Sequence, residues 1–175
     1  MRVNTPRFGQ LDIPQEAIVT FPRGLCGFPE LRECCLLPHS PGSPLRWLQC
    51  LNDTRLAFLT AEPHTFFPEY DIELTEAEAA ALELRRSEDA AVLTLVTVSD
   101  GIESQESPHG PDISVTANLA APIIINTRSR TARQVILDDE RYTTKHSLGL
   151  PGLGGEGPAT VAAGSDHASP DTKGR

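Results

Sequence analysis

Short apolar runs, each about the length of a β-strand, recur along the first 137 residues and are separated by turn-forming residues. Turn sequences such as Pro22-Arg23-Gly24 and Asn52-Asp53 end the runs, as is typical between the strands of an antiparallel sheet. The predicted strands are 11–13, 17–21, 34–37, 45–51, 56–61, 90–98, 113–118, 123–127 and 133–137. This pattern predicts a mainly β single domain, with a small antiparallel barrel or sandwich-like sheet.

Two parts of this pattern are more specific. Residues 45–51 and 56–61 flank the Asn52-Asp53 turn, and their alternating apolar residues predict a hairpin with one buried face. The run Pro122-Ile123-Ile124-Ile125 is apolar at every position, which is typical of a strand that is covered on both faces. We expect this strand to lie at the centre of the core.

One segment departs from the strand pattern. Strong helix formers, mainly Ala, Glu and Leu, follow Thr75, and Glu78 lies three residues after it. A threonine at the N-cap and a glutamate at the third helical position form a capping box, in which each side chain bonds the other residue's backbone N–H. The sequence therefore predicts one short helix at about 75–85.

Two segments have little apolar content. The polar stretch 99–111 predicts an exposed loop. From Leu148 onward the chain is rich in Gly, Ala, Pro and Ser and has no apolar periodicity, so burial cannot offset the roughly 1–2 kcal/mol of backbone entropy lost per ordered residue. We predict one folded domain at 1–147 and a disordered tail at 148–175.

The charge balance narrows the possible partners. Fifteen Lys and Arg against twenty-four Asp and Glu give a net charge of −9, which disfavours direct nucleic-acid binding and permits, without requiring, a basic protein partner. The N-terminus lacks the apolar run of a signal peptide, and no stretch reaches the roughly 18 consecutive apolar residues of a membrane span. We expect a cytoplasmic protein without a membrane segment.

Residues that serve in catalysis or metal binding are present without a productive spacing. The five histidines occur singly, and there is no GxSxG sequence around a serine. Residues 152–157 match GxGxxG, but no convincing strand precedes them and no helix follows. The run Asp138-Asp139-Glu140 lacks the spaced oxygen ligands of a calcium loop. We therefore predict no enzyme activity, no catalytic residue, no cofactor and no metal.

The cysteines favour free thiols packed as small apolar residues. They are Cys26, Cys34, Cys35 and Cys50, and no two form a CxxC pair. The adjacent pair Cys34-Cys35 has poor geometry for a structural disulfide. A thiol-dependent redox protein is one alternative, since Arg32 near this pair is a cation able to lower a thiol pKa. A β-barrel that binds a small ligand in its mouth is a second alternative.

Nine sequence blocks, in one order along the chain, resemble the FliW family of flagellar assembly factors. They are Phe8-Gly9, Phe21-Pro22-Arg23-Gly24-Leu25-Cys26-Gly27-Phe28, Arg46-Trp47-Leu48-Gln49, Leu56-Ala57-Phe58, Phe67-Pro68-Glu69-Tyr70, Ala90-Ala91-Val92, Val96-Thr97-Val98, Asn118-Leu119-Ala120-Ala121-Pro122-Ile123-Ile124-Ile125-Asn126 and Gln134-Val135-Ile136-Leu137-Asp138-Asp139. Each block is weak alone, and the specificity comes from their shared order across residues 2 to about 142. Two departures are Cys50, where a small polar residue is more usual, and the tail after Leu148. They leave open a redox response at Cys50 and a regulatory contact by the tail.

The resemblance implies a small, mostly β protein that binds flagellin subunits in the bacterial cytoplasm. It also implies binding to CsrA, an RNA-binding repressor of flagellin translation. The implied mechanism is partner switching: flagellin occupies the FliW-like protein and leaves CsrA free to repress, and flagellin export releases the protein to antagonise CsrA. Each partner displaces the other only as far as its binding free energy, or the coupling between the two sites, allows.

Beside this resemblance, two groups of side chains are candidates for partner binding. The acidic candidates, which would complement a basic partner, are Glu69, Asp71, Glu73, Asp138, Asp139 and Glu140. The aromatic candidates, chosen because Trp and Tyr are enriched at interface hot spots, are Trp47, Phe58, Phe66, Phe67 and Tyr70. Ordinary surface charge and core packing are the respective alternatives, with Phe66 and Phe67 expected to be the more accessible. Asn126 is predicted either to cap a turn or to hydrogen-bond a partner.

Overall fold

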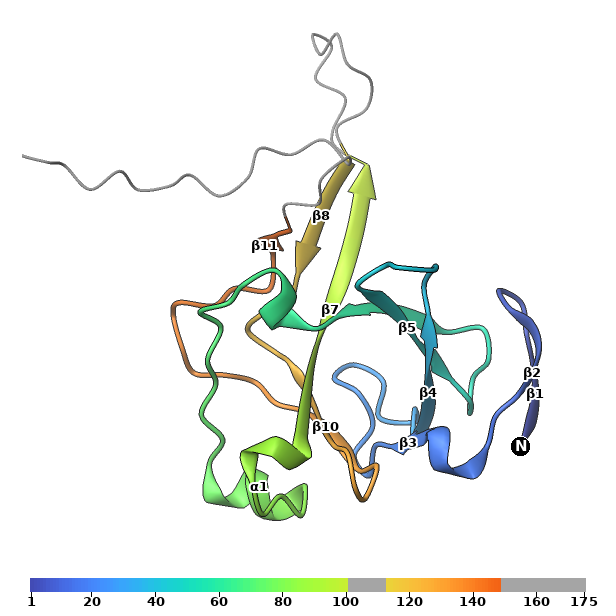
Figure 1. The fold of residues 1–175 in the computed structure, drawn as a ribbon, viewed down its shortest axis with the longest axis horizontal. Coiled ribbons are helices and arrows are strands. Elements are labelled where there is room, and N and C mark those ends of the chain that lie inside the picture. Colours follow the sequence, from blue (N-terminus) through green and yellow to red (C-terminus); the bar gives the residue numbers. More distant parts are fainter. Residues whose placement is uncertain (101–112, 149–175) are drawn as a thin grey trace, which may run out of the picture.

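The computed structural model of the chain describes residues 1–100 and 113–148, and these residues form a mainly β structure (Figure 1). The strands are β1 Arg2–Thr5, β2 Gly9–Asp12, β3 Ile18–Thr20, β4 Glu33–Pro38, β5 Leu45–Cys50, β6 Ala57–Ala61, β7 Ala90–Asp100, β8 Ile113–Ala117, β9 Ile123–Asn126, β10 Ala132–Gln134 and β11 His146–Ser147. The α-helix is α1 Glu76–Ala81, and the short 3-10 helices are η1 Gln15–Ala17, η2 Pro63–Thr65 and η3 Ser87–Asp89. The predicted fold class, mainly β with one short α-helix, is confirmed.

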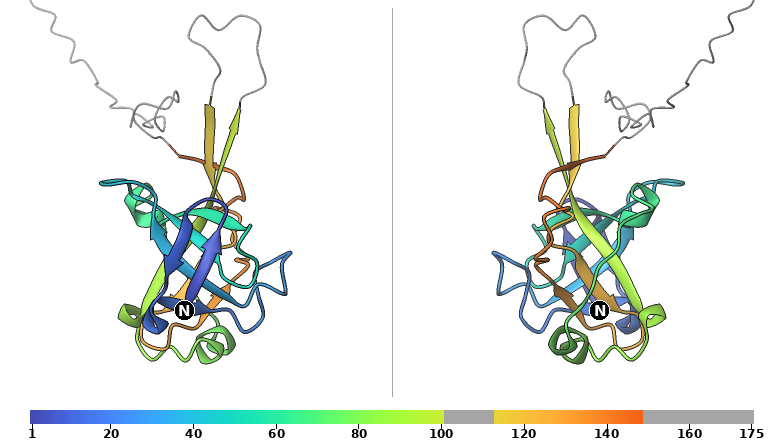
Figure 2. Two further views of the ribbon diagram at one scale, coloured as in Figure 1. Left: turned by 90° about the vertical axis from the view of Figure 1, so that its right-hand side faces the viewer. Right: turned by 90° about the vertical axis from the view of Figure 1, so that its left-hand side faces the viewer.

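Most of the strands belong to one curved antiparallel sheet. Its main path runs β10-β9-β7-β6-β5-β4-β3, and β8 joins it between β7 and β11. The two ends of this path meet at one parallel bridge between Thr20 and Thr131, where the Thr20 N–H donates to the Arg130 carbonyl oxygen at 2.8 Å. Strands β7 and β8 also form a ribbon that stands out from the body in every view (Figure 2).

The predicted hairpin and the predicted central strand are both confirmed. Strands β5 and β6 pair antiparallel, with Leu48 opposite Phe58. Strand β9 is buried along its whole length: Ile123 and Ile125 pack into the interior of the curved sheet, and Ile124 packs on the opposite face against Leu82. The isoleucine run is therefore covered on both faces, because α1 and its flanking residues lie over the outer side of β9.

Helix α1 begins as the sequence predicts and ends four residues earlier than expected. The Thr75 Oγ1 accepts a hydrogen bond from the Glu78 N–H, and the Glu78 carboxylate accepts one from the Thr75 N–H, so the capping box is formed. At the other end Glu83 takes a left-handed conformation, with φ of 55°. The N–H of Glu83 donates to Ala80, and the N–H of Leu84 donates to Ala79, which is the hydrogen-bond pattern of a Schellman C-cap.

Two short strands, β1 and β11, lie outside the predicted set. Strand β1 pairs with β2 in a separate two-stranded sheet, and its Val3 packs with Ile13 and Leu51 in a small apolar cluster. Strand β11 pairs with β8 and leads to Leu148, which is buried and donates its N–H to the Val115 carbonyl oxygen at 2.8 Å. Leu148 thus packs with the domain.

Several sequence-based expectations concern residues outside those described. The predicted loop 99–111 falls mostly there, as do the tail from residue 149 onward and the GxGxxG match at 152–157. The domain boundary at 147 stays a prediction. Among the residues that are described, no helix is long and apolar enough to cross a membrane.

Candidate functional site

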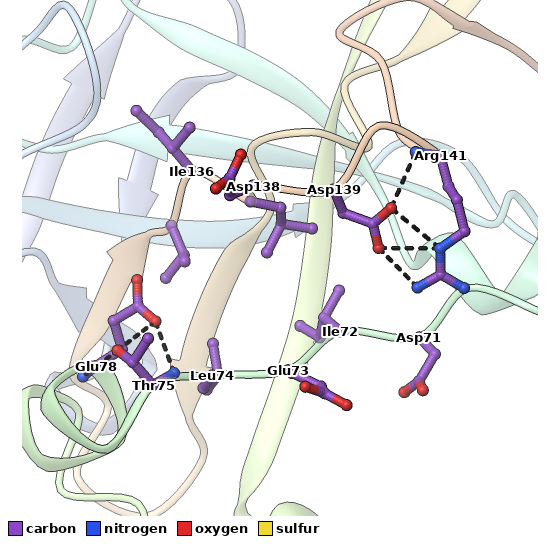
Figure 3. Close-up of a pocket in the computed structure, with 12 residues that line it drawn as sticks. Asp71, Ile72, Glu73, Leu74, Thr75, Glu78, Ile136, Asp138, Asp139 and Arg141 are labelled. Carbon is purple, nitrogen blue, oxygen red and sulfur yellow. Dashed lines mark hydrogen bonds and ion pairs between the residues drawn. The ribbon is translucent and has the colours of Figure 1, made fainter.

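Two extended segments, 71–75 and 135–141, line a groove of about 550 Å³ beside helix α1 (Figure 3). The first segment is anchored by Ile72 and Leu74, which pack on the cluster formed by Leu82, Ile124 and Val135. The second segment continues from β10 and is held by backbone hydrogen bonds from Val135 to Pro122 and from Leu137 to Ala120, each at 2.9 Å. We call this feature the acidic groove.

Four of the six predicted acidic residues line the acidic groove: Asp71, Glu73, Asp138 and Asp139. The Asp139 carboxylate accepts hydrogen bonds from the Arg141 guanidinium, with a shortest distance of 2.7 Å, and this contact lowers the pKa of Asp139. Within residues 1–100 and 113–148, the other three carboxylates have no ion pair and no side-chain hydrogen bond. The groove therefore carries uncompensated negative charge that a cationic partner would neutralise.

Apolar side chains complete the acidic groove. Ile72, Leu74, Val135 and Leu137 line it, and Ile136 lies beside them with 74% of its surface exposed (Figure 3). A solvated isoleucine next to unpaired carboxylates suits a partner that presents both apolar and basic groups. The sequence did carry a signal for Ile136, because the strand alternation that turns Val135 and half-buried Leu137 inward turns the residue between them outward.

The other acidic and aromatic candidates lie elsewhere. Glu69 and Glu140 are exposed and do not line the groove. Trp47, on β5, is half-buried in a cluster of its own, where the Arg7 guanidinium lies 4.4 Å from its ring centroid and the His39 ring stacks at 5.9 Å. Trp47 is thus available at the surface only in part, and away from the acidic groove.

The remaining aromatic candidates contribute to packing. Phe58 lies edge-on to Phe28 at 5.5 Å, against the main core, and Phe66 and Phe67 are half-buried against a second apolar cluster. Tyr70 is only 3% exposed, and its hydroxyl donates to the Leu119 carbonyl oxygen at 2.8 Å. Burial raises the pKa of Tyr70 well above its usual range. Tyr70 is therefore a core residue and cannot serve as a surface anchor in this conformation.

The polar side-chain atoms of Asn126 all form hydrogen bonds within the chain. It is 3% exposed, its Nδ2 donates to the carbonyl oxygens of Leu82 and Glu83, and its Oδ1 accepts from the N–H groups of Arg128 and Ser129. Of the two alternatives left open by the sequence, the geometry supports the turn cap. The partner hydrogen bond is not supported, because no polar atom of the side chain is left to make it.

The chain matches a known protein family over most of its length. The sequence model described as "FliW protein" matches residues 2–148. The chain belongs to the FliW family. Relatives named "Flagellar assembly factor FliW" include one from Natranaerobius thermophilus, 38% identical over 148 residues that cover 85% of this chain and 92% of the relative. Another, from Bacillus subtilis, is 37% identical over 149 residues that cover 85% of this chain and 97% of the relative.

A solved structure of the FliW family has the same fold. The crystal structure of a flagellar assembly factor FliW superposes with a TM-score of 0.73 at 35% identity, covering 85% of this chain and 96% of that chain. The FliW match includes both walls of the acidic groove, since 71–78 and 135–141 fall inside residues 2–148. The groove thus lies within the part of the chain that matches the FliW family.

The cysteines of this FliW chain are free thiols. Cys34, Cys35 and Cys50 are buried and Cys26 is exposed. The Sγ atoms of Cys34 and Cys50 lie 3.6 Å apart on paired strands, and this contact together with burial raises the pKa of Cys34. Among the described residues, no group of three or more His, Cys, Asp and Glu side chains is arranged to hold a metal ion.

Proposed function

We propose that this FliW-family chain binds flagellin subunits in the bacterial cytoplasm and, in alternation with flagellin, binds the translational repressor CsrA. Free chain sequesters CsrA and allows flagellin synthesis, while flagellin-bound chain leaves CsrA free to repress it. The chain acts by binding alone, as a chaperone-like assembly factor without catalysis. This links translation of flagellin to its export.

The acidic groove is the observation that carries the CsrA half of the proposal. CsrA is a basic RNA-binding protein, and Asp71, Glu73 and Asp138 offer carboxylates that no described residue neutralises. Such charges speed the encounter with a basic partner and lose strength as salt screens them over about 8–10 Å. Ile136 and the apolar lining supply the contact area that charge alone does not.

Family membership carries the flagellin half of the proposal, because relatives at 37–38% identity are named flagellar assembly factors. The acidic groove does not by itself identify the flagellin surface. A switch requires only that occupation by one partner lowers the affinity for the other, through overlap or through negative coupling.

Binding measurements with purified proteins test both halves. We expect CsrA from the source bacterium to bind the full chain at about 50 mM salt and to weaken strongly at about 300 mM. Flagellin, kept monomeric, is expected to bind and to displace CsrA. Failure of both proteins to bind contradicts the proposal, and simultaneous binding of both with unchanged affinities contradicts the switch.

A charge-reversal variant tests the place of CsrA binding. We expect the double variant Glu73→Lys/Asp138→Lys to weaken CsrA binding by about tenfold or more, because two favourable charges become repulsive. The matched control is Glu16→Lys/Glu30→Lys, which makes the same change in net charge at exposed residues that do not line the groove. Equal weakening by the two double variants assigns the effect to net charge and contradicts the groove.

A further inference from the structure

Strand β7 has one edge that pairs with no described strand over its first residues. On one edge, Ala90 to Leu93 pair with β9. On the other edge, β6 pairs with β7 only at residues 94–96 of β7, because after Ala61 the chain turns into η2 at Pro63. Continuing the β6–β7 register would place Pro63 opposite Val92, and a proline has no N–H to donate.

The polar groups of Val92 point to this edge. The Leu95 carbonyl oxygen accepts a hydrogen bond from the Asn118 N–H at 2.8 Å, so the backbone N–H and C=O groups of odd-numbered β7 residues point toward β8 and β9. The N–H and C=O groups of even-numbered residues point toward the opposite edge, because these groups alternate along a strand. No described residue hydrogen-bonds the N–H or the carbonyl oxygen of Val92 on that side. Val92 therefore offers a free donor and a free acceptor to an added strand.

Pockets flank this edge on both faces of the strand. A pocket of about 490 Å³ lies on the outer face, beside Ile72, Leu74 and Ile124. A second pocket of about 400 Å³ lies on the interior face, beside Leu36, Leu93 and Ile125. The pockets share His64, Ala90 and Val92 in their lining. We call the edge Ala90 to Val92 with its two pockets the β7 slot.

Cationic side chains surround the β7 slot. Arg85 and Arg86 line the outer pocket together with Asp71, and Arg46 and Arg130 line the interior one together with Glu62, so cations outnumber carboxylates in both. Arg46 lies 3.6 Å from Glu62, whereas Arg85, Arg86 and Arg130 have no ion pair within the described residues. The Arg130 Nε is buried without a hydrogen-bond partner there. The β7 slot thus differs in charge from the acidic groove, and the basic partner proposed for the groove does not suit it.

We propose that the β7 slot binds an extended segment of an acidic protein partner as an added β-strand. The backbone of the segment pairs with Val92, and its side chains, which alternate between faces, enter the two pockets in turn. The outer pocket, with Ile72, Leu74 and Ile124, takes apolar side chains. The interior pocket, with Arg46 and Arg130, takes acidic side chains. The occupant is therefore a segment in which apolar and acidic residues alternate.

A designed probe tests strand addition on the full chain. The probe is a fluorescent heptapeptide in which leucine and glutamate alternate, and its binding is measured by anisotropy. We expect binding, with slowed hydrogen exchange of the Val92 amide. Absence of binding, or binding that leaves Val92 exchange unchanged, overturns the proposal.

Two methylated versions of the probe test the backbone pairing. One carries N-methyl groups on its leucines and the other on its glutamates. Because N–H groups of a strand alternate in direction, only one version loses the bonds to β7, and we expect it to bind about tenfold or more weakly while the other retains affinity. Equal effects of the two methylation patterns overturn strand addition.

Charge variants test the acidic character of the occupant. Arg46→Glu, in the interior pocket that takes the glutamates, is expected to weaken the leucine–glutamate peptide several-fold. Lys145→Glu, at an exposed residue that lines neither pocket, is expected to leave it unchanged. A leucine–lysine peptide of the same length is expected not to bind. Equal weakening by both variants, or equal binding of both peptides, overturns the assignment of an acidic segment.

Discussion

The Asn126 Nδ2 lies 2.9 Å from the carbonyl oxygen of Leu82, the C-cap residue of helix α1. It lies 3.2 Å from the carbonyl oxygen of Glu83 as well, so one buried amide satisfies two carbonyl groups at the helix end. Its Oδ1 holds the turn after β9 through the N–H groups of Arg128 and Ser129. This side chain therefore fixes α1 to β9, and with α1 the segment 71–75 that forms one wall of the acidic groove.

We expect Asn126→Ala to lower the free energy of unfolding by about 2–3 kcal/mol, because buried carbonyl and N–H groups lose their partners. Urea denaturation measures the change. Asn126→Asp keeps the acceptor but places a carboxylate oxygen against the two carbonyl oxygens, so we expect it to destabilise the chain at least as much. Asn4→Ala, at an exposed position, is the control and should change stability by less than about 0.5 kcal/mol. A loss below that level in Asn126→Ala contradicts the capping role.

Glu83 occupies a position that favours glycine. Its φ of 55° is left-handed, which costs a residue with a Cβ roughly 1–2 kcal/mol. We expect Glu83→Gly to raise the free energy of unfolding by about 0.5–1 kcal/mol. Glu83→Ala is the matched control, since it removes the same carboxylate and keeps the Cβ. If both variants change stability equally, the effect comes from the carboxylate and the strain is not relieved.

The sequence predicted the elements that are specified locally. Strand β9 could be predicted because Ile123, Ile124 and Ile125 are apolar at consecutive positions, and the start of α1 because Thr75 and Glu78 form a local capping box. The end of α1 could not, because Glu83 has no sequence signal for a left-handed cap, and the helix stops where Leu82 is buried. Strand β11 could not be predicted, because it has two residues and is defined by pairing with β8, which is distant in sequence. Strand β1 forms a local hairpin with β2, but Val3 is its one apolar residue, so it has no apolar pattern.

The candidate site could be predicted only in part, because contacts between residues distant in sequence decide which side chains come together. Charge alone indicates Asp71, Glu73, Asp138 and Asp139, and tertiary structure brings the two pairs together across the acidic groove. Residue type alone indicates Tyr70, and only the three-dimensional contacts place its hydroxyl on a buried carbonyl group. Residue type indicates what a side chain can do, while its burial is decided by long-range packing.

The burial of three cysteines predicts their reactivity. With Ellman's reagent at pH 8 we expect one thiol to react quickly, that of exposed Cys26, and three to react slowly. Contact with Cys50 and burial raise the pKa of Cys34, and burial raises the pKa of Cys35, so little thiolate of either is present to react. The contact with Cys34 lowers the pKa of Cys50, and Cys50 is expected to be slow because its side chain is fully buried. Four thiols in denaturant calibrate the assay, and Cys26→Ser should abolish the fast phase. Fast reaction of Cys34 or Cys35 in the native chain would favour the thiol redox alternative instead.

The exposed Ile136 predicts an apolar contribution to binding at the acidic groove. In a complex its side chain would leave water, and burying an isoleucine contributes about 1.5–3 kcal/mol, which corresponds to about tenfold or more in affinity. We expect Ile136→Ser to weaken CsrA binding by about that factor, chiefly through faster dissociation, with the salt dependence unchanged because no charge is removed. Val98→Ser is the matched control: Val98 is 53% exposed on the β7–β8 ribbon and does not line the groove. If Val98→Ser weakens binding and Ile136→Ser does not, CsrA contacts the ribbon, and the acidic groove is not its docking site.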